Sequence, residues 1–168
     1  LLINLLSLKD EHKAGVSASI LAKCCEIHGQ QDRIQSYGGL RAIMKLLQSK
    51  LLKVQESSME CLAAMTNENK ELALAVSLEP ETVSTLLKLS KTGNPSVKLL
   101  ACRCITNIST QPDAPEEIEK LRVHLLPIVI KLLKQLLYAQ DPHVPHVLAK
   151  LLYDNCLLYT SPSPRDNR

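Results

Sequence analysis

The chain repeats itself at intervals of just over forty residues. Two columns of mostly apolar residues recur with the same spacings of 41, 43 and 43 residues: Leu6, Leu47, Ser90 and Leu133 in one, and Leu21, Leu62, Ile105 and Leu148 in the other. Periods of roughly 40 to 47 residues are typical of solenoids built from two-helix or three-helix units. Such units bury their apolar faces only against their neighbours. The spacing therefore predicts a tandem helical array.

Helical signals within one period indicate where its helices lie. Between Tyr37 and Met65, one apolar stripe has helical spacing, a break near residues 49–53 follows, and a second stripe continues to Met65. We expect Gly38 and Gly39 to end a short helix that begins near residue 31. In the next period, Asn94 caps a helix start because its side chain accepts backbone N–H groups. The two stripes predict core residues: Leu40, Ile43, Met44 and Leu47, then Val54, Ser58, Met59, Cys61, Leu62 and Met65.

The repeat columns also predict how the chain is divided. We expect a partial repeat over residues 1–28, two repeats over about 29–68 and 69–110, and a truncated repeat over 111–155. Residues 156–168 are excluded from the array, because CLLYTSPSPRD from Cys156 to Asp166 resembles a translated sequencing-adapter read. Pro162 and Pro164 in this tail cannot continue a helix.

The repeat unit resembles an armadillo repeat, whose pattern is roughly G-A-I-P-x-L-V-x-L-L, a short turn, then V-Q-x-x-A-A-x-A-L-x-N-L. HLLPIVIKLL at His124 to Leu133 is similar to its middle helix, with Pro127 on the family's proline. The resemblance implies an all-α, right-handed superhelical armadillo solenoid of about three to four repeats over residues 1–155. The matched positions of the clearest unit are Gly38, Leu40, Ile43, Leu46, Leu47, Val54, Gln55, Cys61 and Leu62.

Armadillo arrays are protein-binding scaffolds, and the order of the repeats resembles, more narrowly, armadillo subunits of E3 ubiquitin ligases of the CTLH/GID type. This resemblance implies a non-catalytic subunit that links a substrate receptor to the catalytic core in proteasome-dependent degradation, in cytoplasm and nucleus. Its partners would be extended or tail peptides of other ligase subunits. The alternatives are another armadillo adaptor of the junctional, vacuolar or signalling kind, and a nuclear transport receptor.

Groove residues follow from the resemblance, because an armadillo array binds peptides along the concave side of its last helices. The groove positions lie one helical turn apart. The residues at these positions are mixed in character, with a slight excess of basic side chains. Lys23, Arg103 and Lys150 could pair with carboxylates of a bound peptide. Nuclear-import receptors carry Trp and Asn here, whereas this chain has no Trp and only Asn107 fits. The alternative interpretation is that the groove candidates are ordinary solvated helix residues. The candidates are Ser19, Lys23, Glu60, Ala64, Arg103, Asn107, His146 and Lys150.

Composition excludes several other classes of protein. A formal net charge of +3, with basic and acidic residues interspersed, gives no dense basic face for nucleic acid. No apolar run approaches the ~20 residues that cross a bilayer, so we expect no membrane insertion. No Gly-rich phosphate loop, G-x-S-x-G elbow or H-E-x-x-H motif is present. The sequence therefore predicts neither an enzyme nor a cofactor.

The cysteines and histidines offer a weak alternative of metal or redox chemistry. Cys24, Cys25 and His28 lie close in sequence, as do His143 and His146, but no C-x-x-C spacing occurs. When the repeats are aligned, Cys61, Cys102 and Cys104 occupy positions at which the armadillo family usually has Ala. Such positions need small buried side chains, so we expect these thiols to pack in the core.

Overall fold

The structure is a computed structural model that describes residues 2–8, 10–27, 29–111, 114, 116–136 and 143–160. The described residues contain ten helices and no strand. In chain order they are α1 (Leu2–Leu6), α2 (Glu11–Cys24), α3 (Gln30–Ser36), α4 (Gly39–Leu46), α5 (Leu52–Met65), α6 (Lys70–Ser77), α7 (Pro80–Thr92), α8 (Pro95–Ser109), α9 (Glu116–Leu136) and α10 (His143–Thr160).

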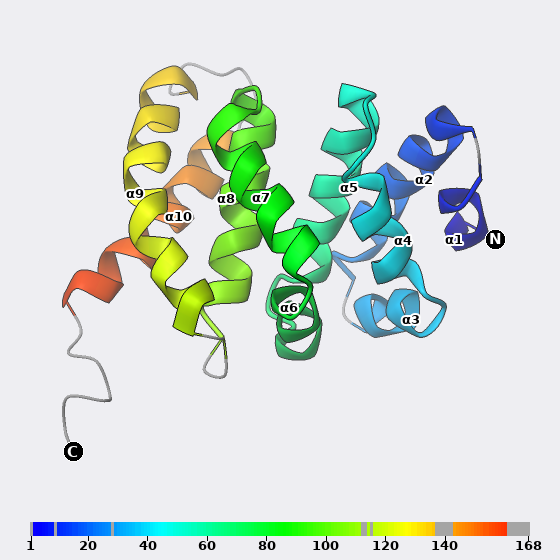
Figure 1. The fold of residues 1–168 in the computed structure, drawn as a ribbon, viewed down its shortest axis with the longest axis horizontal. Helices are drawn as coiled ribbons and strands as arrows, with labels where there is room; N and C mark the ends of the chain where they lie inside the picture. The colour runs from blue at the N-terminus through cyan, green and yellow to red at the C-terminus, as the bar shows by residue number, and fades with distance from the viewer. Residues whose placement is uncertain are drawn as a thin grey trace.

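The helices stand side by side in a single extended row (Figure 1). Two complete units each contain a short helix, a middle helix and a longer last helix, namely α3 to α5 and α6 to α8. The next unit differs, because one 21-residue helix, α9, takes the place of the short and middle helices and carries Pro127 inside it. The last helices of successive units pack against one another, α2 on α5 and α5 on α8. The prediction of an all-α solenoid is confirmed.

The two repeat columns lie in the core. Leu21 is 4% exposed, and Leu62, Ile105 and Leu148 are fully buried in the last helices of four successive units. The predicted stripes of the clearest unit are likewise buried, except Met44, which is half-buried. Burial of each large aliphatic side chain contributes about 1.5 to 3 kcal/mol, so these columns supply much of the energy that holds neighbouring units together.

The turns between helices use the residues that the sequence marks. Asn94 accepts a hydrogen bond from the N–H of Val97 at 2.8 Å, and Pro95 occupies the first turn of α8. Gly38 adopts a left-handed φ of 78° at the end of α3. Gly39 belongs to the next helix: it begins α4 against the backbone of Ile34, where a side chain would not fit. The expectation that both glycines end the short helix is therefore wrong for Gly39.

A polar network that sequence reasoning missed ties α3 to the turn between α5 and α6. The side-chain amide of Gln31 donates to the carbonyls of Ala64 at 2.8 Å and Asn67 at 3.1 Å. Asn69 caps α6 by accepting from the N–H of Leu72, and its amide donates to the Gln31 carbonyl. These bonds satisfy carbonyl groups at the end of α5 that have no partner within the helix.

The predicted boundary at Asn155 is not a helix boundary, since α10 continues to Thr160. Pro162 and Pro164 lie outside the described residues. The assignment of residues 156–168 to a sequencing-adapter tail stays a prediction.

Candidate peptide-binding groove

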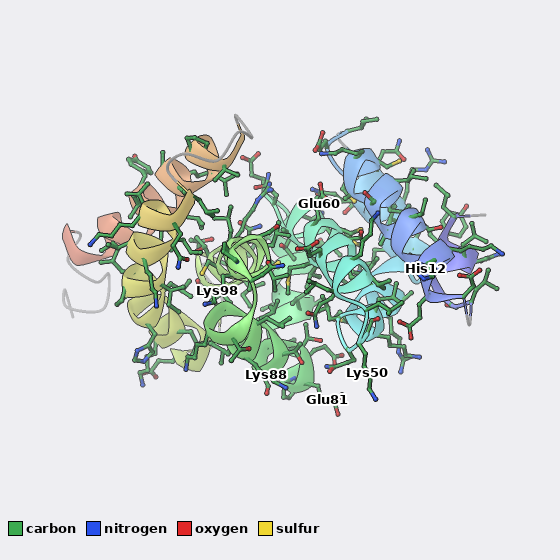
Figure 2. The ribbon with its side chains drawn as sticks, turned by 90° about the horizontal axis from the view of Figure 1, so that it is seen from above. His12, Lys50, Glu60, Glu81, Lys88 and Lys98 are labelled. Atoms are coloured by element: carbon green, nitrogen blue, oxygen red, sulfur yellow. The ribbon has the colours of Figure 1, made fainter. Side chains whose placement is uncertain are left out.

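A groove runs across the last helices of successive units. Its hollow has a volume of about 720 Å³, and its walls come from α2, α5, α8 and α10 and from the turns beside α2 and α5. Figure 2 shows the array as a crescent: Glu60 lies on the side toward which α2 and α10 bend, while Lys50, Glu81 and Lys88 lie on the opposite side. The groove therefore occupies the concave face, because stacking wedge-shaped units curves the solenoid.

Four of the eight predicted groove residues line this hollow: Lys23, Glu60, Ala64 and Arg103. Ser19 is half-buried and Lys150 is exposed, and neither belongs to the lining. The side chain of His146 lies outside the described part of the chain. The structure thus brings together Lys23, Glu60, Ala64 and Arg103. Ser19, Asn107 and Lys150 are outside this lining.

The Asn107 side chain forms hydrogen bonds within the protein. Its side-chain amide donates to the carbonyl of Ala63 at 3.0 Å and to the hydroxyl of Thr66 at 3.2 Å, both on the preceding last helix or its cap. Both amide hydrogens are therefore used inside the protein, which leaves no donor for a peptide backbone. Asn107 joins α8 to α5.

Charges in the groove are balanced rather than leaning basic. Three carboxylates, of Glu26, Glu56 and Glu60, share the lining with three cations, of Lys23, Lys53 and Arg103. Sequence reasoning missed half of these groups, Glu26, Lys53 and Glu56, because they lie outside the two positions that the repeat pattern singles out.

Internal ion pairs join the charged side chains of the groove beside α2. Lys23 forms ion pairs with Glu26 at 3.1 Å and with Glu60 at 3.4 Å, and the hydrogen bond to Glu26 raises the pKa of Lys23 above its ordinary value. All three side chains are substantially exposed, so these pairs contribute little to stability. One cation against two carboxylates gives this end of the groove a net negative charge.

Two cations remain without an internal partner. Lys53 on α5 and Arg103 on α8 form no hydrogen bond or ion pair with any side chain that the structure describes, whereas Glu56 accepts a hydrogen bond from the Asn94 amide at 2.9 Å. Beside Arg103 the lining becomes apolar, with Leu99, Leu100, Val144 and Val147. This half of the groove therefore offers positive charge next to an apolar surface.

Cys61, Cys102 and Cys104 lie in the core, as predicted. Cys25, Cys61, Cys102 and Cys104 are buried and Cys24 is half-buried, all as free thiols. Burial raises the pKa of both thiols of α8 to about 12, so they stay protonated. The histidines of the metal alternative, His28, His143 and His146, have side chains outside the described part. Within that part, no group of three or more His, Cys, Asp or Glu residues could hold a metal ion.

A search for membrane spans over the described residues finds no helix that is both long enough and apolar enough to cross a bilayer.

Comparison with known proteins identifies similar folds among solved structures. No family model matches the chain, and no curated protein matches it. One engineered protein of known crystal structure is 26% identical, with a TM-score of 0.67 over 92% of this chain and 60% of its own. A second engineered protein is also 26% identical, with a TM-score of 0.68 over 92% of this chain and 36% of its own. A designed armadillo repeat protein is 14% identical, with a TM-score of 0.39.

The chain therefore spans less than two thirds of the length of the two engineered proteins that it matches. Their likeness extends over nearly all of this chain, and its own units repeat a short, a middle and a last helix with the last helices lining a concave groove. The chain has the architecture of an all-α repeat solenoid.

Proposed function

We propose that this protein is a non-catalytic scaffold that binds other proteins through the concave groove. The observation that carries the proposal is a pair of cations, Lys53 and Arg103, which have no partner among the residues that the structure describes and which line a groove of about 720 Å³ next to an apolar wall. Charged groups without an internal partner are available to pair with a ligand. Solenoid proteins use such extended concave surfaces for binding.

The groove favours an extended segment that carries a carboxylate close to an apolar side chain. The Arg103 guanidinium can form two parallel hydrogen bonds with a carboxylate. Leu100 and Val147, both half-buried beside it, can receive an aliphatic or aromatic side chain. The paired charges of Lys23 and Glu60 add little selectivity, because each already has a partner.

At a finer level, we propose that the scaffold is a subunit of a ubiquitin ligase of the CTLH/GID type, located in cytoplasm and nucleus. This rests on the order of the segments AKCCEIHGQQDRIQSYGGLRAIMKLL, KVQESSMECLAAMTNENKELALAV, VKLLACRCITNIS and VPHVLAKLLYDN, which resembles armadillo repeat-containing protein 8. In this proposal the groove holds tail peptides of neighbouring subunits, and other chains transfer ubiquitin.

The test is co-purification with two matched charge reversals. A groove variant carries Lys53→Glu and Arg103→Glu, and a control variant carries Lys50→Glu and Lys88→Glu on the opposite side of the array (Figure 2). Both change the net charge equally. We expect the wild type and the control to recover RING-type and LisH/CTLH-domain subunits, and the groove variant to recover at least tenfold less while its helical circular dichroism is unchanged.

Two outcomes would count against the proposal at different levels. Equal recovery by both variants would mean that the groove is not the binding surface. Loss of binding by the groove variant alone, with cadherin tails or nuclear-import cargo as the recovered partners, would support the scaffold and overturn the ligase assignment.

A further inference from the structure

Each last helix has two flanks, one on either side of its buried column residue. The column residues are Leu21, Leu62, Ile105 and Leu148, on α2, α5, α8 and α10. Successive residues of a helix lie about 100° apart around its axis, so the residues directly before and after the column residue lie on opposite flanks. We call these the leading flank and the trailing flank. The leading residues are Ile20, Cys61, Cys104 and Val147, and the trailing residues are Ala22, Ala63, Thr106 and Ala149.

Contacts between α5 and α8 show which way the flanks face. The Cys104 thiol, on the leading flank of α8, donates to the carbonyl of Met59 on α5 at 3.7 Å. Asn107 lies three residues further along the same flank. Its amide donates to the carbonyl of Ala63, on the trailing flank of α5, at 3.0 Å. The leading flank of one last helix therefore packs on the trailing flank of the last helix before it.

The flanks are covered where two last helices meet in this way. Cys61 and Cys104, on the leading flanks of α5 and α8, are fully buried. Val147, on the leading flank of α10, is half-buried and also lines the groove. The trailing residues that are followed by another last helix are at most 2% exposed: Ala22, Ala63 and Thr106.

The same positions are open on α2 and α10, the last helices nearest the two ends of the row (Figure 1). On the leading flank of α2, Ile20 is 44% exposed, and Val16, one turn earlier, is 60% exposed. On the trailing flank of α10, Ala149 is exposed, and so is Pro145, one turn earlier. Each end of the row therefore exposes apolar side chains on a flank that the inner units bury.

We propose that copies of this chain associate head to tail, with the trailing flank of α10 in one copy packed on the leading flank of α2 in the next. A second copy is the partner that fits, because the flank open at one end is the kind that covers the flank open at the other. The packing of α2 on α5 and of α5 on α8 is the same type of junction. In the contact between copies, Ile20 and Ala149 take the places that Cys104 and Ala63 hold between α8 and α5.

The contact joins two different surfaces, which determines how the association proceeds. A dimer formed in this way still has one open flank at each end, so further copies can add to it. Only a few apolar side chains, from one helix of each copy, leave water at the contact, as in transient interfaces rather than obligate ones. Since α2 and α10 both line the groove, a row continued in the same sense places the groove of one copy beside that of the next. The length of the binding surface then depends on protein concentration.

The experiment is sedimentation velocity with light scattering on the full chain, at concentrations from about 10 µM to about 1 mM, where weak complexes form. An α2 variant carries Val16→Lys and Ile20→Lys, and an α10 variant carries Pro145→Lys and Ala149→Lys. A control variant carries Leu78→Lys and Ile130→Lys, at positions that are 65% and 43% exposed and lie outside both flanks. All three variants gain the same charge. We expect the average mass of the wild type and of the control to rise with concentration, and that of the α2 and α10 variants to stay at one chain.

Mixing the two flank variants tests the head-to-tail geometry. The α2 variant keeps an intact trailing flank on α10, and the α10 variant keeps an intact leading flank on α2. An equimolar mixture should therefore form a dimer of one copy of each and nothing longer, although neither variant associates alone.

Several results would overturn the proposal. A wild type that keeps the mass of one chain at every concentration excludes the association, and a control variant that fails to associate shows that the flanks are not specific. An α10 variant that dimerises like the wild type shows that two α2 flanks pair with each other instead. Circular dichroism checks that each variant is folded. If a double variant is not, the single substitution Ile20→Lys or Ala149→Lys replaces it.

Discussion

Comparing Asn107→Ala with Arg103→Ala distinguishes a residue that stabilises the array from a residue that binds a ligand. The Asn107 amide gives two hydrogen bonds to the end of α5, to the carbonyl of Ala63 and the hydroxyl of Thr66. Arg103, one turn earlier on α8, lines the groove, which Asn107 does not, and has no partner among the described residues. Asn107→Ala should therefore lower stability and Arg103→Ala should lower binding, although both positions belong to one groove pattern.

The size of the effect follows from the two bonds. Each contributes about 0.5 to 1.5 kcal/mol, so their loss costs about 1 to 3 kcal/mol. Alanine is the better helix former, which returns up to about 0.7 kcal/mol. The net loss in the free energy of unfolding is then about 0.3 to 3 kcal/mol. For a domain of this length that lowers the melting temperature by roughly 1 to 12 °C.

The assay is thermal unfolding followed by circular dichroism at 222 nm, with partner binding measured well below the transition. We expect Asn107→Ala to melt at a lower temperature and to bind like the wild type. Arg103→Ala should change stability by no more than about 0.5 kcal/mol, since it removes no internal bond, and should weaken binding. An Asn107→Ala protein that melts like the wild type but fails to bind would refute the reasoning, because the amide would then face the ligand.

Three further outcomes are expected. Gly39→Ala should destabilise the fold by about 1 to 3 kcal/mol in urea unfolding, because its methyl group would lie 2.7 Å from the carbonyl oxygen of Ile34. Gln31→Ala should lower the melting temperature more than Gln35→Ala on the same helix, since of these two side chains only Gln31 bonds to the end of α5 and the turn after it. Equal melting temperatures of the two variants would show that this network does not stabilise the fold. Both cysteine thiols of α8, whose pKa values are about 12, should resist iodoacetamide from pH 7 to pH 10 in the folded protein and react on unfolding.

Much of the fold follows from the sequence alone, because local spacing determines which side of a helix is apolar. The repeat columns predict the core, and Leu62 and Ile105 are indeed fully buried. The cap at Asn94 is where the sequence places it, since a cap depends only on residues three apart. The helical array and its concave face follow from the same repetition.

Contacts between units were decided only by the tertiary structure. The Asn107 amide reaches Ala63 across 44 residues of sequence, and Gln31 reaches Ala64 across 33. The same packing leaves Arg103 without a partner among the residues that the structure describes. Helical periodicity specifies which side of its own helix a residue occupies. It does not specify which polar atom of the neighbouring helix that side chain meets, because the relative position of two packed helices depends on every side chain between them.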